Sequence, residues 1–506
     1  MATLAPPAAA PPRVTTEGRR TVRDSLVVTL GGQLERGLGT LTALALRWWL
    51  DPARLGVYTG LRLYLDNTNR TSLGVGLGAV QEIPILLAQG RGEEARRVAD
   101  IAYTTNTLTC TLYALVLAVW GASRAVWLRG DPLAAEWTWG LVATAGLVVI
   151  KRYESFLIAV LRAHREFVLT TKLDVLESLV SACAVGLGLW LAGFWGLLAS
   201  VAVILGVKIA YLHAAHPLRF RWRWELPTAL RLLRLGLPIL ANTAAFGAVL
   251  GLDRALILWR VPDGARAAGL YTIALMGTSW SLDLAGRIVL VLYTAFQTTL
   301  GRTRDPAEVA RQALRATEAQ APLLAAGSAV AFVVGPVFLG SLMPKYVEGL
   351  PALRPLLAGT LLLGLAWPAR QMLIALDRPY RLCAATLAGL AVTALAGIVG
   401  ADRAGIVGVA WGMTAGYGAV YLLTSATAFA GPLGWRTWFA HEARLGVNLL
   451  AFAAGALVAS RLSPPGLRPW AVLAARCVFL TAWLLPLLWA WGRAHDWGGL
   501  RARRNS

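Results

Sequence analysis

Charged side chains occur inside an apolar stretch of the chain that runs from Leu55 to Arg97. Arg62, Asp66 and Arg70 are spaced so that a helix carries all three on one face. A charged side chain at the centre of a bilayer costs roughly 3 kcal/mol on insertion scales, so such residues face water or protein rather than lipid. This segment is therefore predicted to line a wet cavity inside a membrane protein.

Other apolar segments carry charges as well. Arg36 shares a predicted helix face with Thr29, Gln33 and Thr40. The remaining charges of this kind are Asp253, Arg254, Asp283 and Arg287. Two interpretations stay open, because Arg62 with Asp66 and Asp283 with Arg287 have the spacing of internal ion pairs, while four polar faces could also converge on one cavity.

Arginine exceeds aspartate among these residues. There are five such arginines (Arg36, Arg62, Arg70, Arg254 and Arg287) but only three such aspartates (Asp66, Asp253 and Asp283). Guanidinium groups bind phosphate through paired, charge-assisted hydrogen bonds. The five arginines are therefore candidate ligands of a phosphate-bearing substrate.

Charged residues near the ends of predicted spans are less informative. Lys151, Arg152 and Glu154 near the fourth span, and Arg370 in the tenth, could form the rim of a cavity or extend to the membrane surface. Asp174 and Glu177 begin the fifth span, where an interfacial position is expected.

The composition is that of a polytopic membrane protein. The chain is 57% hydrophobic and 15% charged, with a mean hydropathy of +0.58, whereas globular domains are about 25% charged. The basic residues that give the net charge of +21 lie between apolar segments. Nucleic acid is therefore not an expected partner.

Catalytic, metal and cofactor motifs are not recognisable in the sequence. The four cysteines are isolated and the five histidines fall in or beside loops, so no metal site or bound cofactor is predicted. The longest predicted extracytoplasmic loop, Ala122 to Trp137, offers only Asp131 and Glu136 as carboxylates. The glycines in SLGVGLGAV follow no strand and indicate helix breaking or close helix packing. The chain is predicted not to be an enzyme.

Fourteen apolar segments are long enough to cross a bilayer. They lie near residues 25–49, 55–88, 98–121, 138–161, 173–192, 195–212, 235–259, 267–296, 320–342, 350–376, 382–400, 404–430, 444–461 and 470–492. Basic residues concentrate in alternate loops and at both ends, so the positive-inside rule places both termini in the cytoplasm. The second segment is too long for one straight crossing and is expected to tilt or break.

The two halves of the chain resemble one another. Gly56, Tyr58 and Thr59 align with Gly269, Tyr271 and Thr272, and Leu157, Ile158 and Ala159 align with Leu373, Ile374 and Ala375. The repeat predicts two six-helix lobes related by a pseudo-two-fold axis. The expected parts are a disordered cytoplasmic tail (1–23), an N-terminal lobe (24–213), an amphipathic connector (214–234), a C-terminal lobe (235–430) and two further spans with a basic tail (431–506).

The sequence resembles a known family at two places. LGVYTGLRLYLDNTNRTSLGVGLGAVQEIPILLAQGRGEEARR and LRAHREF are similar to the second-span and fourth-span patterns of oligosaccharide flippases in the multidrug/oligosaccharidyl-lipid/polysaccharide exporter superfamily. The resemblance implies alternating-access transport of an undecaprenyl-diphosphate-linked oligosaccharide for cell-surface polysaccharide synthesis, including O-antigen. Family arginines in the first, second and eighth spans match Arg36, Arg62 or Arg70, and Arg287.

The resemblance also sets expectations about partners and location. Asp66, Asp253 and Asp283 are candidates for H⁺ or Na⁺ coupling, and the partners are the lipid-linked oligosaccharide, membrane lipids and polysaccharide polymerase machinery. The location implied is the bacterial cytoplasmic membrane. Two alternatives remain, a cation-coupled multidrug and toxin antiporter and a membrane enzyme of polysaccharide assembly. An antiporter favours an acidic, aromatic-lined cavity, and an enzyme needs loop carboxylates.

Overall fold

The structure is a computed structural model that describes residues 37–127, 130–163, 167–215, 220–462 and 469–494. In these ranges the regular secondary structure is helical throughout. Residues 37–49 are helical. The elements that follow are α2 (Pro52–Asp66), η1 (Asn67–Ser72), α3 (Val75–Ala88), α4 (Gly92–Trp127), α5 (Ala134–Ala163), α6 (Phe167–Ala215), α7 (Leu226–Arg260), α8 (Gly264–Thr303), α9 (Pro306–Leu342), η2 (Pro344–Ala352), α10 (Leu353–Leu365), α11 (Trp367–Ala375), α12 (Pro379–Ser425), η3 (Ala426–Ala430), α13 (Gly431–Leu433), α14 (Trp435–Arg461) and α15 (Pro469–Ala494).

These helices occupy the predicted apolar segments after the first one, of which residues 37–49 are described. By length and composition, eight helices in the described ranges qualify as membrane spans. The chain is therefore an all-α, multi-pass membrane protein. The predicted disordered tail at 1–23 lies outside the described residues.

The second predicted segment breaks, as its length requires. α2 ends at Asp66, the 3₁₀ helix η1 follows, and the chain turns at Leu73 (φ 51°) and Gly74 (φ 97°) before α3 begins. The backbone of Gly74 also packs against that of Gly236 in α7, where a side chain would not fit. The glycine-rich stretch therefore serves both as a helix break and as a close packing site.

Two helix hairpins repeat the same backbone geometry. α6 reverses at Ala192 (φ −142°, ψ 16°) and Gly193 (φ 54°, ψ −126°), and α12 reverses at Ala404 (φ −142°, ψ 21°) and Gly405 (φ 54°, ψ −132°). The positions are separated by nearly the same offset as the sequence matches between the two halves. The hairpins therefore support an internal repeat at the level of backbone conformation.

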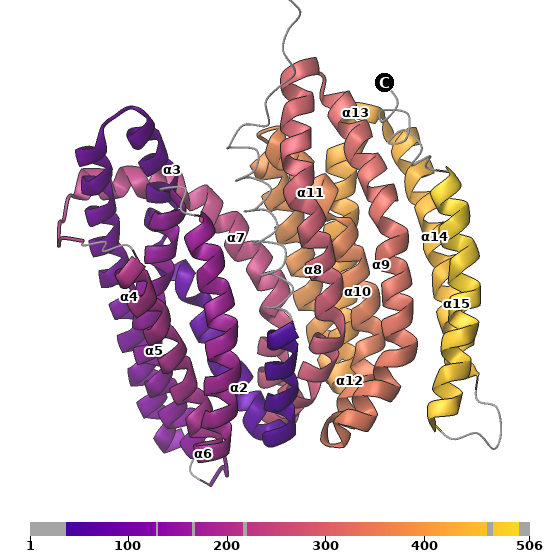
Figure 1. Ribbon diagram of the computed structural model, residues 1–506, viewed down its shortest axis with the longest axis horizontal. Helices are drawn as coiled ribbons and strands as arrows, with labels where there is room; N and C mark the ends of the chain where they lie inside the picture. The colour runs from indigo at the N-terminus through magenta and orange to yellow at the C-terminus, as the bar shows by residue number, and fades with distance from the viewer. Residues whose placement is uncertain (1–36, 128–129, 164–166, 216–219, 463–468, 495–506) are drawn as a thin grey trace, which may run out of the picture.

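The helices form two bundles that meet at the lower end of the view in Figure 1 and lie further apart at the upper end. The largest apolar cluster is continuous across both bundles, with Leu55, Leu61 and Leu141 from the first and Tyr271 and Leu353 from the second. The remaining apolar clusters belong to one bundle or the other, except that Leu232 of α7 joins a cluster of the first bundle. The two bundles therefore share a core at only one end.

The contact between α2 and α8 is symmetric. A Cβ atom added to Gly56 would overlap the carbonyl oxygen of Ala265, and one added to Gly269 would overlap that of Pro52. These are repeat-related positions, so each helix presents the same small residue to the same turn of its partner. Absence of a side chain at both glycines lets the two backbones touch.

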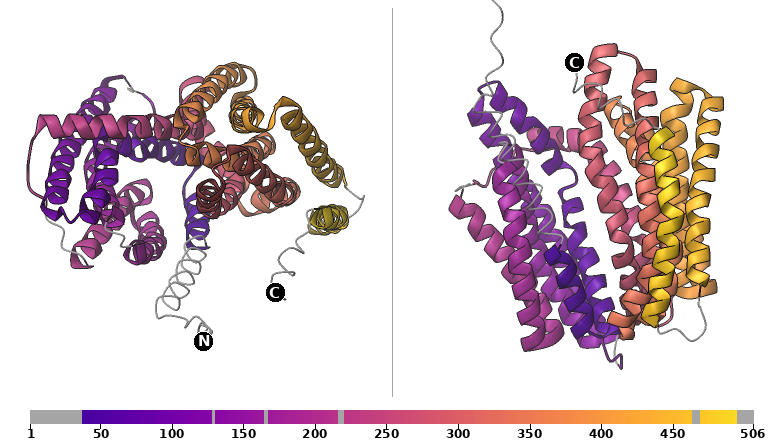
Figure 2. Two further views of the ribbon diagram at one scale, coloured as in Figure 1. Left: turned by 90° about the horizontal axis from the view of Figure 1, so that it is seen from above. Right: turned by 45° about the vertical axis from the view of Figure 1, so that its right-hand side comes forward.

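Helix α7 packs against both bundles. Its first half lies against α3, where Gly78 meets the backbone of Leu232, and its second half lies against α12, where Leu256 meets Gly397. Figures 1 and 2 show α7 running from the first bundle toward the second. The second part of the predicted connector, from Leu226 onward, is thus the start of this helix.

The last two helices pack on the outside of the second bundle. Ala325 and Val333 of α9 contact Phe452 of α14 and Leu480 of α15 in one apolar cluster. Figure 2 shows α14 and α15 at the edge of the bundle, away from α2. They therefore form no part of the contact between the two bundles.

Candidate functional site

A cavity of about 630 Å³ lies inside the first bundle and is closed on one side by α7. Its walls come from the broken segment α2–η1–α3, from α5 and α6, and from Leu240, Thr243, Ala244 and Gly247 of α7. The break in the second segment turns backbone and polar side chains of η1 toward this space. An interrupted helix is tolerated at this depth only where it borders protein or a wet cavity.

Arg70 lies at the end of η1 and borders the cavity. Its Nη2 would lie 2.7 Å from a Cβ atom on Gly247, so the guanidinium group rests against the backbone of α7. Within the described ranges, Arg70 has no carboxylate at ion-pair distance. Its charge is therefore available to a guest in the cavity.

Arg152 is a second cation without a carboxylate partner among the described residues. It is 8% exposed, and its Nη1 donates a hydrogen bond to Oδ1 of Asn69 at 3.1 Å. Gly76 leaves room for the guanidinium group beside Asn106, whose amide atoms are buried without partners in the described structure. Buried polar groups of this kind are normally hydrogen-bonded to protein, water or ligand.

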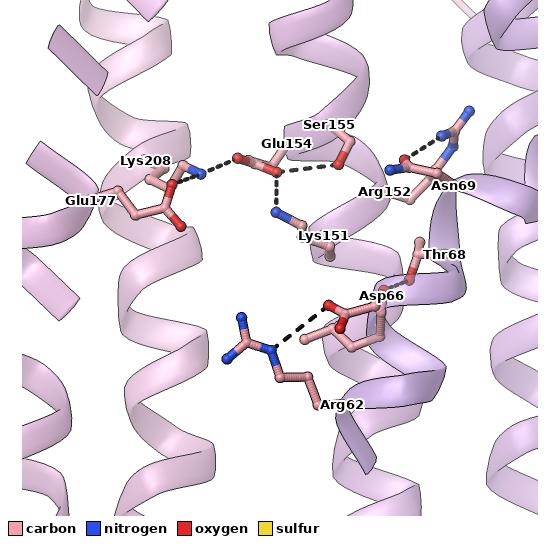
Figure 3. Close-up of polar contacts among 11 residues, drawn as sticks. Arg62, Asp66, Thr68, Asn69, Lys151, Arg152, Glu154, Ser155, Glu177 and Lys208 are labelled. Carbon is pink, nitrogen blue, oxygen red and sulfur yellow. Dashed lines mark hydrogen bonds and ion pairs between the residues drawn. The ribbon is translucent and has the colours of Figure 1, made fainter. Parts of the chain in front are cut away.

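The lysines around the cavity are neutralised in one network with a buried centre, drawn in Figure 3. Glu154 accepts from Lys151 at 3.0 Å and pairs with Lys208 at 2.5 Å, and Lys208 also pairs with Glu177. The side chains of Glu154 and Lys208 are 1% and 4% exposed. Two lysines and two glutamates thus balance each other, and this network adds no net charge to the cavity.

Arg62 and Asp66 form the predicted pair on α2. Arg62 Nε lies 3.8 Å from Asp66 Oδ1, and both side chains are more than half exposed (Figure 3). Such an exposed pair is weakly bound. Asp66 borders the cavity, while Arg62 lies one helical turn away.

Asp253 and Arg254 form a separate site within α7, outside this cavity. Asp253 is fully buried, and Arg254 Nε lies 3.5 Å from its Oδ1. The Oδ2 atom has no hydrogen-bond partner in the described part of the chain. These two predicted residues therefore do not line the same space as Asp66 and Arg70.

The other predicted site residues cannot be placed. Arg36 lies outside the described residues, as do the side chains of Asp283 and Arg287, although the backbone of both belongs to α8. Metal binding has no candidate in the described ranges, where no group of three or more His, Cys, Asp or Glu side chains is suitable.

Three residues at this site were predicted otherwise or missed. Asp174 lines the cavity and Glu177 bonds Lys208, although the start of the fifth span suggested an interfacial position. Lys208 was missed. The presence of one lysine within the sixth apolar segment could have indicated an ion pair here, because a buried lysine in a membrane protein needs an acidic partner.

Arg370 of the second bundle lies on the other side of α7. Its guanidinium carbon is 4.0 Å from the ring centre of Phe246 and 5.5 Å from that of Trp367. It is 4% exposed and donates a long hydrogen bond of 3.4 Å to Thr386. Cations of both bundles thus contact adjacent residues of α7, Phe246 and Gly247.

Solved structures of membrane transporters share this fold. Solved structures with this fold include the lipid II flippase MurJ in an inward closed conformation, with 11% identity and a TM-score of 0.68 over 93% of this chain and 99% of that one. A multidrug resistance transporter of the MATE family, inward-facing, matches with 15% identity and a TM-score of 0.56 over 81% and 94%. A MOP superfamily transporter from Pyrococcus furiosus matches with 12% identity and a TM-score of 0.54 over 83% and 96%.

The family is identified from the sequence itself. The polysaccharide biosynthesis protein family matches residues 85–347, which is more than half of the chain. The chain belongs to this family, and its fold is that of the MOP superfamily. No curated protein matches the sequence.

Proposed function

We propose that the protein is a flippase that moves an undecaprenyl-diphosphate-linked oligosaccharide across the membrane by alternating access, for cell-surface polysaccharide synthesis. The observation that carries this proposal is a pair of guanidinium groups, Arg70 and Arg152, that have no carboxylate partner among the described residues and lie at one cavity of a polysaccharide biosynthesis family member. A diphosphate supplies the opposite charge and accepts paired hydrogen bonds from both groups.

In this proposal, different parts of the substrate contact different surroundings. Arg70 and Arg152 hold the diphosphate, polar side chains such as Asn69 and Thr243 face the sugars, and the lipid tail stays in the bilayer. We extend the proposed substrate site to Arg36, Arg62, Arg254 and Arg287. These residues belong to neighbouring spans or to the repeat-related half.

Coupling to an ion is part of the proposal. Asp253 is buried, and one of its carboxylate oxygens has no hydrogen-bond partner in the described structure, so it is a candidate to take up a proton or Na⁺. Asp66 and Asp283 are the other candidates. The bundles share a core at one end only, an arrangement suited to a cavity that opens at one side at a time.

The predicted topology completes the proposal. We propose fourteen crossings, with lobes at 24–213 and 235–430, a connector at 214–234, and a C-terminal part at 431–506. Both termini lie in the cytoplasm and the membrane is the bacterial inner membrane. Polysaccharide polymerase machinery is the expected protein partner.

The test is transbilayer movement of a short undecaprenyl-diphosphate oligosaccharide in proteoliposomes. Arg70→Ala and Arg152→Ala should each slow transport roughly tenfold to a hundredfold, because each removes charge-assisted hydrogen bonds to the diphosphate. Arg70→Lys should recover part of the rate. Arg260→Ala is the matched control, since Arg260 pairs with Asp402 in an exposed ion pair outside the cavity.

The outcome of the transport assay distinguishes between two functions. Wild-type rates in both cavity variants would reduce these arginines to structural cations and refute the proposal. The alternative function is a cation-coupled multidrug and toxin antiporter, and the shared fold with a MATE family transporter favours it. Efflux of a cationic dye by the wild type, without movement of the oligosaccharide lipid, would select the antiporter.

A further inference from the structure

A second cavity, of about 460 Å³, lies in the other bundle and shares no lining residue with the first. One wall is the face of α9 that carries Arg311, Leu314, Arg315 and Glu318, at helical spacing. The opposite wall comes from α13 and the beginning of α14. In Figure 1, α13 lies at the upper end of the second bundle, where the bundles are separated.

Three arginines face this cavity, and two of them keep free hydrogen-bonding capacity. Arg311 pairs with Glu308 at 2.8 Å and with Asp305 at 3.4 Å, so its charge is largely compensated. Arg315 has no carboxylate at ion-pair distance in the ranges described. Arg444 has a single long contact, 3.9 Å, to Glu318.

Glu318 is the one carboxylate among the lining residues, and it is already engaged. His441 Nδ1 lies 3.1 Å from its Oε1, and the Glu318 side chain is 17% exposed. The guanidinium groups of Arg315 and Arg444 are therefore the exposed charges that a ligand meets first. The cavity favours an anion, and phosphate suits two guanidinium groups.

Aromatic side chains mark the same end of α14 as a membrane interface. Trp435 is 60% exposed and Phe439 is 61% exposed, one helical turn apart, and their rings lie 6.1 Å apart. Tryptophan concentrates at the headgroup level of a bilayer, because its apolar ring carries a polar N–H group. Neither ring lines the cavity, and helical spacing places both on the face of α14 opposite Thr437 and Arg444. Trp435 therefore marks the level of this end of α14, which is that of phospholipid phosphates. A lipid phosphate is held at this level by its acyl chains, whereas a free phosphate ion is not.

We propose that the cavity between α9 and α14 binds the phosphate of an anionic glycerophospholipid through Arg315 and Arg444, with the acyl chains in the adjoining bilayer. The leaflet involved is the one at the end where both helices begin. This site is independent of the proposed transport function. It makes the activity or stability of the protein sensitive to the acidic lipid content of its membrane.

Native mass spectrometry of the purified full-length protein, titrated with phosphatidylglycerol or phosphatidylcholine, tests the proposal. We expect the wild type to prefer phosphatidylglycerol, and Arg315→Ala/Arg444→Ala to weaken its binding roughly thirtyfold, since each basic residue contributes about a factor of five at the headgroup surface. The Lys/Lys variant should retain most of the binding. Millimolar inorganic phosphate should not displace the lipid.

Two further variants separate this site from other basic surfaces. Arg302→Ala/Arg381→Ala removes two exposed arginines outside the cavity and should bind like the wild type. Arg70→Ala/Arg152→Ala should also bind like the wild type, which distinguishes this site from the transport cavity. Arg315→Ala alone removes an exposed, unpaired side chain, so it serves as the test if the double variant fails to fold.

The proposal is overturned by any of three results. These are equal binding of the two lipids by the wild type, equal loss in the Arg302/Arg381 control, and displacement of the lipid by inorganic phosphate. The last result would show that the cavity recognises a phosphate ion and not a lipid.

Discussion

The basic side chains around the first cavity fall into two kinds. Lys151 and Lys208 are balanced by Glu154 and Glu177, whereas Arg70 and Arg152 have no carboxylate partner in the part of the chain described. The lysine network fixes α5 against both arms of α6. The arginines leave positive charge for a ligand.

Glu154→Gln should destabilise the protein by about 3 kcal/mol, because it leaves Lys151 and Lys208 close together and without their shared carboxylate. The measurement is the thermal unfolding temperature in detergent. Glu348→Gln, which breaks an exposed pair with Arg266, is the control and should change little. A Glu154→Gln variant as stable as this control would show that the network contributes little to stability.

The sequence predicted the polar face of α2 and η1 better than it predicted the network. Spacing alone placed Asp66 and Arg70 on one side of a helix, and they border the same cavity. Lys208 and Glu177 belong to two arms of one hairpin, so their pairing depends on the reversal at Ala192 and Gly193. The sequence predicted this reversal, between the spans at 173–192 and 195–212, but it did not specify which residues of the two arms face each other, so the partner of Lys208 was not evident.

At the scale of helices, close backbone contact holds the two bundles together at one end. Gly56 and Gly269 face Ala265 and Pro52 across the α2–α8 contact. Arg47 reinforces it, since its Nη2 donates to the carbonyl oxygen of Thr272 at 2.8 Å. Any added side-chain volume at the glycines must separate the helices.

Gly56→Ala and Gly269→Ala should therefore each lower the thermal unfolding temperature by several degrees. The double variant should be less destabilised than the sum, because the first substitution already separates α2 from α8. Gly146→Ala is the matched control, as a Cβ there meets open space and alanine favours a helix. Full additivity of the two substitutions would contradict a shared contact.

Hydrogen bonds and an ion pair at the surface connect the start of α7 with α4. Arg97 Nε donates to Glu225 Oε1 at 2.8 Å, and Arg223 also donates to this carboxylate. The backbone N–H groups of Arg221 and Arg223 donate to Asp100 and Thr104 of α4. These contacts hold the connector residues before α7 against α4.

The hydrogen bond from Arg97 lowers the pKa of the Glu225 carboxyl below its usual value. Its stabilising contribution is thus complete above the unfolded-state pKa and is lost as pH falls through the lowered folded-state pKa. Glu225→Gln should lower the unfolding temperature near neutral pH and have no effect once the wild-type carboxyl is protonated. A difference that persists unchanged in strong acid would contradict this assignment.

Apolar length predicted the positions of the helices well, because the thickness of the bilayer sets the length of a span. The start of α7 was not evident from the sequence. The Arg/Trp pattern before Leu235 suggested a surface segment, whereas from Leu226 it is the first part of a long helix that packs on α3. Helix pairing of this kind depends on neighbours that a single sequence does not specify.

For the whole molecule, the position of α7 restricts how the bundles can move. One half of it packs on α3 and the other half on α12. The bundles can exchange their open and closed ends only if one of these two contacts changes. Bistable packing of this type is a common basis of large conformational changes.

Fixing both halves of α7 at once should stop transport. In a background without the four native cysteines, one engineered disulfide between α7 and α3 and a second between α7 and α12 place one link in each contact. Oxidised double-link protein should be inactive and recover when reduced. Transport at the wild-type rate with both links formed would show that α7 keeps both contacts throughout the cycle.

The position of α7 also determines whether the two repeat-related halves could fold as separate polypeptides. Leu240, Thr243, Ala244 and Gly247 complete the cavity of the first bundle but belong to the predicted C-terminal lobe, which begins at residue 235. An N-terminal fragment ending before α7 would have a cavity open on one side. Although the sequence repeat suggests two equivalent units, the cavity of the first bundle is complete only after the second unit has supplied its first helix.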